Sequence, residues 1–146
     1  MKKKLVAALA VALVVVAAPL ANAKATVSAT PTKNLSQKSA VVSFKFSKMP
    51  AKNGLYIEEC MAPSVKGATP SVCDSDQTVQ AWVSNVKADL AQGATSAKGT
   101  VKFKPVPYFT NGDCVHTTCV FFITNDHNAA GDKSQDQVIP FTFSAK

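Results

Sequence analysis

Four cysteines carry the clearest chemistry in this chain of 146 residues: Cys60, Cys73, Cys114 and Cys119. An even number of cysteines in an exported protein indicates disulfides, and four cysteines allow three pairings. Pairing between sequence neighbours is the simplest of the three. Each short cross-linked loop would then stabilise the fold by roughly 2–3 kcal/mol. Such bridges would stiffen two surface loops without joining distant parts of the chain.

Metal binding and catalysis find little support in the other reactive residues. The last two cysteines, with His116 and His127, offer ligand types that suit zinc. Disulfide formation would leave only the histidines, so no metal site is predicted. Glu58 and Glu59 are adjacent in a predicted strand and point to opposite faces, so they cannot form a carboxylate pair. No strand-turn-helix elbow places a nucleophile beside a base. We therefore expect no catalytic residues, no enzyme activity and no cofactor.

The N-terminus reads as a secretory signal peptide. Lysines fill 2–4, an apolar run covers 5–18, and the small-residue sequence Ala-Asn-Ala occupies 21–23. We expect cleavage after 1–23, which leaves one domain at 24–146 that is secreted to the extracellular space. No later apolar run is long enough to span a bilayer, so no membrane anchor is expected.

The charge pattern argues against nucleic-acid binding. The predicted mature chain has 13 lysines, no arginine and nine acidic residues. Lysines scattered along the chain predict no patch that follows phosphates. Arginine, the residue that usually recognises guanine through two hydrogen bonds, is also missing. The remaining 123 residues suffice for one hydrophobic core, and we expect a monomer.

Alternating apolar and polar residues predict a chain built almost entirely of strands. In 40–47, for example, Ala40, Val42, Phe44 and Phe46 alternate with more polar neighbours. The same reasoning gives seven strands, at 26–30, 40–47, 55–60, 78–83, 99–104, 119–124 and 138–144. Residues 86–90 fit either a strand extension or a short helix.

These strands predict an antiparallel β-sandwich. The apolar run at 120–123 suits a central strand that is covered on both faces. Pro140 indicates an edge strand or a bulge, because proline cannot donate a ladder hydrogen bond.

Two segments carry a resemblance to a known family. Leu-Tyr-Ile-Glu-Glu-Cys at 55–60 comes first, and Gly-Asp-Cys-Val-His-Thr-Thr-Cys at 112–119 follows, before an apolar strand and a glycine-containing turn. In order and spacing, 24–146 resembles the neocarzinostatin-type apoproteins. The resemblance implies a seven-stranded immunoglobulin-like sandwich with disulfides Cys60–Cys73 and Cys114–Cys119. It also implies a secreted carrier that sequesters an apolar aromatic molecule, an enediyne-type chromophore, in a groove beside the first disulfide.

Strand parity places the groove residues that the resemblance implies. If Leu55 and Ile57 belong to the core, their neighbours Tyr56 and Glu58 face the groove. The same alternation turns the even-numbered residues of 119–124 outward, and the aromatic residues at 108–109 lie near a family contact position. The predicted ligand-binding residues are Tyr56, Glu58, Met61, Tyr108, Phe109, Val120, Phe122 and Thr124.

Other interpretations of these residues stay open. Phe122 stands where close ligand approach calls for glycine, so its ring either stacks on a different ligand or fills the groove. The aromatic residues could instead be packing residues, with Trp82 at a sheet edge. The alternative function is an extracellular immunoglobulin-like interaction module that binds protein or cell wall and has no small-molecule ligand.

Overall fold

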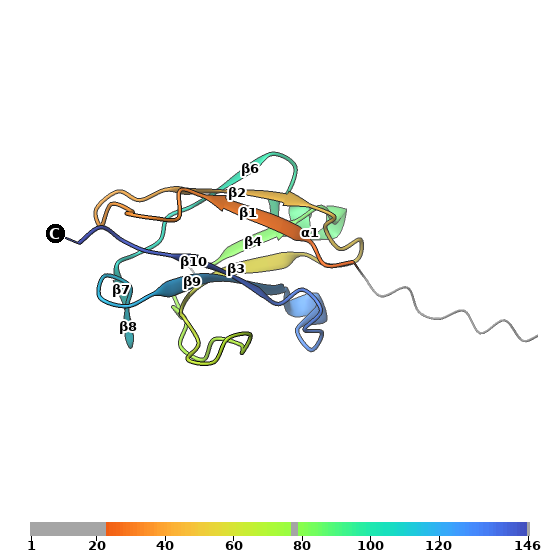
Figure 1. The fold of residues 1–146 in the computed structure, drawn as a ribbon. Helices are drawn as coiled ribbons and strands as arrows, with labels where there is room; N and C mark the ends of the chain where they lie inside the picture. The colour runs from red at the N-terminus through yellow and green to blue at the C-terminus, as the bar shows by residue number, and fades with distance from the viewer. Residues whose placement is uncertain (1–22, 77–78, 146) are drawn as a thin grey trace, which may run out of the picture.

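The computed structural model describes residues 23–76 and 79–145, and strands dominate it (Figure 1). Residues 1–22 of the predicted signal peptide lie outside the described residues, as does Thr78. The strands are β1 (Thr26–Thr30), β2 (Val42–Ser47), β3 (Leu55–Met61), β4 (Ala81–Ser84), β5 (Thr95–Ser96), β6 (Thr100–Phe103), β7 (Tyr108–Phe109), β8 (Gly112–Asp113), β9 (Cys119–Asn125) and β10 (Gln137–Phe141). A five-residue helix, α1 (Lys87–Ala91), and the 3-10 turn His127–Ala129 complete the elements. The ambiguous segment 86–90 is thus mostly helical.

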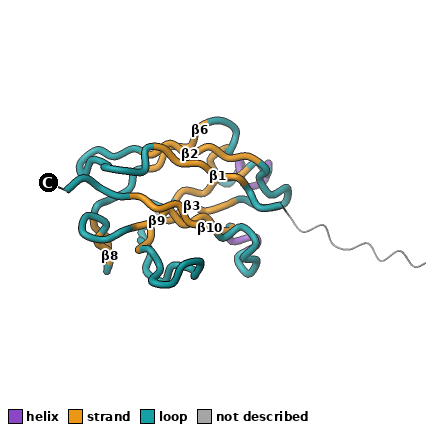
Figure 2. The backbone as a smooth tube through the Cα atoms, viewed as in Figure 1, coloured by secondary structure: helices purple, strands orange, loops and turns teal. Residues whose placement is uncertain are grey.

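The strands form two larger sheets that lie as two layers, with a small hairpin at one end (Figures 1 and 2). One sheet has the order β1-β2-β6 and the other β10-β9-β3-β4-β5, while β7 pairs with β8. All pairs between strands of four or more residues are antiparallel. Two short pairings depart from the predicted antiparallel arrangement: the two-residue β5 pairs parallel to β4, and an isolated bridge between Leu35 and Phe143 is also parallel.

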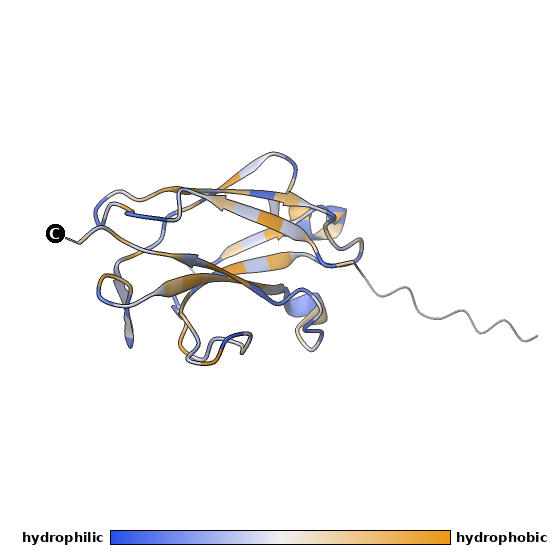
Figure 3. Ribbon diagram, in the orientation of Figure 1, coloured by the Kyte–Doolittle hydropathy of each residue, from blue (hydrophilic) through white to orange (hydrophobic). Residues whose placement is uncertain are grey.

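The core lies between the two layers and follows from the alternation in β2 and β9. Phe44 from β2 meets Phe121 from β9 edge to face at 5.1 Å between ring centroids, and Phe121 stacks on Phe141 at 4.1 Å. Figure 3 shows apolar and polar residues alternating along the strands of both layers. All seven residues of β9 are buried, which confirms the prediction of a central strand.

Four predicted strands are shorter in the structure: those predicted at 40–47, 78–83, 99–104 and 138–144. In the first and last of them, other backbone partners replace the sheet. Of the segment 40–47, the first two residues lie outside the sheet and β2 begins at Val42, because Ala40 N donates its hydrogen bond to Ser36 O in the preceding turn. After Phe141, Thr142 N donates to Thr32 O and the chain leaves β9 for the β1–β2 loop. The edge position of β10 agrees with the expectation from its proline.

Both disulfides join sequence neighbours, Cys60 to Cys73 and Cys114 to Cys119. They close loops with sequence separations of 13 and 5 residues. None of the four cysteines is free. In the part of the chain that is described, no helix has the length and apolarity needed to cross a membrane.

Candidate functional site

The outer face of β3 and β9 brings most of the predicted binding residues side by side. Antiparallel pairing sets Tyr56 opposite Thr124, Glu58 opposite Phe122, and Cys60 opposite Val120. Cross-strand partners on one face lie about 5 Å apart at Cβ. Five predicted residues and the first disulfide therefore form one continuous surface, which we call the β3–β9 face.

The other three predicted residues lie elsewhere. Met61 follows Cys60 and so points to the opposite side, where it packs against the main core together with Phe109. Tyr108 is 52% exposed in the small hairpin and lines a separate hollow with Gln37 and His116. The structure therefore separates the residues around the second disulfide from the β3–β9 face.

Side chains and a loop cover much of the β3–β9 face. Val120 and Phe122 are buried and pack with Cys60, Cys73 and Ala62 in a second apolar cluster. Figure 2 shows the long β3–β4 loop, which starts after Met61, extending below the five-stranded sheet. The Phe122 ring therefore packs under the first disulfide in this structure.

Two small hollows remain beside this cluster. One of about 100 Å³ lies between Phe122, residues 67–69 and 136–138. The other, of about 260 Å³, is lined by Glu58, Gln80 and residues 73–76. Larger hollows of about 510 and 420 Å³ lie at another place, around Gln37 and Lys38.

Two carboxylates, those of Glu58 and Asp136, contact polar side chains at the β3–β9 face. Gln80 Nε2 donates to Glu58 Oε1 at 2.6 Å, and burial raises the pKa of the Glu58 carboxyl above its ordinary value. Asp136 accepts a hydrogen bond from Thr124 Oγ1 at 2.7 Å, while its buried Oδ2 has no protein partner. Asp136 also lines the smaller hollow, together with Phe122.

An aromatic cluster that the sequence did not predict adjoins Tyr56. The Tyr56 hydroxyl lies 2.6 Å from His127 Nδ1, and the Trp82 ring lies 5.0 Å from the His127 ring. Trp82 Nε1 donates to the fully buried Asp126, whose Oδ2 also accepts from Gly54 N. Trp82 is therefore fixed beside Tyr56. The alternation in β4 already put Trp82 on the outward face, but Asp126 gave no sequence signal beyond that of a turn residue.

Glu59 occupies the opposite, core-facing side of β3, as the alternation in this strand predicted, but no role was predicted for it from the sequence. It is 1% exposed, its Oε2 accepts from Val106 N at 2.9 Å, and its Oε1 has no protein partner. Burial raises the pKa of Glu59 to about 8. The sequence signal for the burial of Glu59 was its spacing: it follows Leu55 and Ile57 at the two-residue period of a strand, so all three side chains point to the same side.

The described residues place three potential metal-ligand atoms together only at Glu58, Cys60 and Cys73, within 4.8 Å of one another. The two sulfur atoms are bonded to each other in the first disulfide. A single carboxylate is then left for a cation, which is a poor ligand set.

Comparisons with known proteins do not identify this chain. No protein-family profile, curated protein or solved structure matches it. The assignment of function therefore depends on the geometry of the β3–β9 face.

Proposed function

We propose that this protein is a secreted carrier that binds an apolar aromatic small molecule on the β3–β9 face, in a neocarzinostatin-type immunoglobulin-like sandwich. The strand pattern supports the fold part of this proposal. Among the described residues, seven strands have four or more residues, and they divide into β1-β2-β6 and β10-β9-β3-β4. Such a three-plus-four division suits an immunoglobulin-like sandwich.

Phe122 and Asp136 line the same hollow, and the buried Oδ2 of Asp136 has no protein partner; this is the observation that carries the binding proposal. A buried acceptor without a donor costs free energy, which a ligand with one suitable donor group would recover. The apolar Phe122 ring offers a stacking surface. Small-molecule sites typically have an apolar wall that contains a small number of polar groups.

Ligand entry requires the covering loop to move. The smaller hollow, at about 100 Å³, is below the roughly 300–1,000 Å³ of ordinary ligand sites. In the covering loop, Val65 is 66% exposed and Ala68 N donates to Val65 O within one local turn. An exposed loop with local contacts opens at low free-energy cost. Displacement of residues 67–69 would enlarge the hollow.

Two matched probes test the proposal. Naphthol has a flat aromatic ring and one hydroxyl donor, whereas methoxynaphthalene has the ring without the donor. We expect naphthol to bind about tenfold more tightly, because only naphthol can donate to Asp136. Trp82 is the sole tryptophan in the chain, so its emission reports binding to the adjoining face.

Two variants make the test specific. Phe122→Leu keeps an apolar side chain but removes the ring, and we expect naphthol binding to weaken up to about tenfold. Tyr108→Leu removes an exposed ring from the small β7–β8 hairpin, away from the β3–β9 face, and should leave naphthol binding unchanged. Equal effects of the two substitutions, or equal affinity for the two probes, would refute the proposed site.

The alternative function, an extracellular interaction module, has one observation in its favour. Phe122 is only 6% exposed, so its ring already has apolar partners in the folded protein. Failure of both probes to bind, with Trp82 emission unchanged at saturating concentrations, would favour this alternative.

A further inference from the structure

Lysines and acidic residues are divided between the two layers. The segments 24–54 and 97–107, which contain β1, β2 and β6, carry nine lysines and no acidic residue. The rest of the predicted mature chain carries all nine acidic residues and four lysines. The lysines are scattered along the sequence, but the fold brings two distant lysine-rich segments into one sheet.

The outer face of this three-stranded sheet contains only hydroxyl and ammonium groups. Val42, Phe44 and Val101 are buried, so the alternate residues of each strand point away from the core. Strand pairing aligns these outward residues in two rows, Ser28–Lys45–Thr100 and Thr30–Ser43–Lys102. We call this surface the lysine face.

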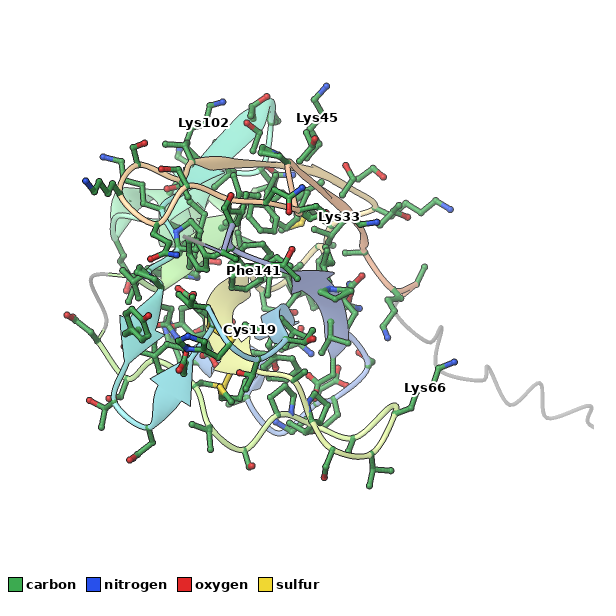
Figure 4. The ribbon with its side chains drawn as sticks, turned by 60° about the vertical axis from the view of Figure 1, so that its left-hand side comes forward. Lys33, Lys45, Lys66, Lys102, Cys119 and Phe141 are labelled. Atoms are coloured by element: carbon green, nitrogen blue, oxygen red, sulfur yellow. A yellow bond between two sulfur atoms is a disulfide. The ribbon has the colours of Figure 1, made fainter. Side chains whose placement is uncertain are left out.

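Both lysines of the two rows are exposed and project from the same side of the molecule. Figure 4 shows Lys45 and Lys102 on one side and Lys66, from the β3–β4 loop, on the opposite side. Lys102 Nζ donates to Ser43 Oγ at 2.6 Å, which holds this ammonium over the sheet. Lys48, Lys98 and Lys104 follow or precede the same strands and are exposed too. The positive charges therefore extend in two dimensions over the layer.

The composition of the lysine face favours an anionic partner that is recognised by charge alone. Its outward rows contain no aromatic ring on which a base could stack, and the chain has no arginine for base reading. The same rows contain no apolar side chain that would insert into lipid tails. Ammonium groups that are spread over an area can all contact the head groups of an anionic lipid surface at the same time. A linear polyanion would contact only the ammonium groups along one row.

We propose that the lysine face docks on an anionic lipid surface. The opposite layer carries the excess of negative charge, so an anionic surface repels that layer and orients the molecule. Docking in this orientation turns the β3–β9 face away from the lipid. This inference goes beyond the proposed carrier function and does not depend on it.

Vesicle binding tests the proposal with protein recovered from the periplasm of an exporting bacterial host and identified by its mass. Vesicles of equal parts phosphatidylglycerol and phosphatidylcholine should sediment the protein, and vesicles of phosphatidylcholine alone should not. Lys45→Gln with Lys102→Gln should weaken binding roughly 30-fold, because each lysine near an anionic bilayer contributes on the order of a fivefold factor. Binding should disappear at 1 M salt, where the Debye length falls to about 3 Å.

A matched pair of substitutions on the other layer provides the control. Lys66→Gln with Lys133→Gln removes the same charge from two exposed loop positions and should not weaken binding. All four lysines are exposed, so both double variants should keep the parent's thermal unfolding midpoint. Equal losses in the two double variants, or binding to phosphatidylcholine alone, would overturn the proposal. So would binding to duplex DNA or linear polyphosphate as tight as binding to the anionic vesicles, since it would assign the face to a soluble polyanion.

Discussion

Replacement of Glu59 by glutamine should remove a large pH dependence of folding stability. Glu59 is buried beside the main core and accepts one hydrogen bond, from Val106 N, at its Oε2. Desolvation is the main cause of its raised pKa, and the charge of Asp74 raises it further. Glutamine has nearly the same shape and can accept the same bond, but it never ionises.

The magnitude follows from proton linkage. In the folded protein the pKa of Glu59 is about 8, against an ordinary value of 4.5. The folded state therefore keeps its proton while the unfolded state loses it, so stability is complete below pH 4.5 and falls as the pH rises to about 8. At 1.36 kcal/mol for each pH unit, the total loss approaches roughly 5 kcal/mol, and about 3 kcal/mol of it is lost by pH 7.

Urea denaturation of both proteins at several pH values between 4 and 9 measures this effect. The free energy of unfolding of Glu59→Gln minus that of the parent should grow with pH by about 3 kcal/mol between pH 4 and pH 7. The histidines and the other carboxyl groups are common to both proteins, so the difference isolates Glu59. A difference that stays constant across this range would refute the assignment of a buried, protonated Glu59.

Three further predictions concern the supports of the β3–β9 face. Asp126→Ala should lower the free energy of unfolding by about 3 kcal/mol and shift Trp82 emission to longer wavelength, because buried Gly54 N and the indole lose their acceptor; an unchanged emission maximum would contradict this. Gly54→Ala should cost more than about 2 kcal/mol in thermal unfolding, since its Cβ would lie 2.7 Å from Val83 O, whereas Gly131→Ala meets no atom within 4 Å and should change stability by less than about 0.5 kcal/mol. Reduction of both disulfides should lower stability by roughly 2–3 kcal/mol for each bridge, measured by urea denaturation with and without reductant; equal midpoints would contradict a stabilising role.

The strands and the core were predictable because local alternation determines them. Val42 and Phe44 alternate with polar neighbours, and the apolar run of β9 requires cover on both faces. The same parity correctly placed Tyr56 opposite to Leu55 and Ile57. Predictions of this kind need only the period of the strand, which the sequence contains.

Features that depend on tertiary contacts were not predictable. The sequence places Trp82 and Asp126 in different segments, and only the pairing of β3 with β4 and β9 brings them within 2.9 Å. Which segment covers Phe122 depends on the path of the β3–β4 loop, for which alternation gives no signal. Segregation of lysines by layer likewise requires knowledge of which strands share a sheet.

Backbone amide chemical shifts during titration with naphthol test the binding proposal most directly. We predict that the largest shifts fall on Phe122, on Asp136 and on the covering residues 67–69, which line the smaller hollow. Shifts confined to Gln37 and Lys38, which line the larger hollows at another place, would contradict it.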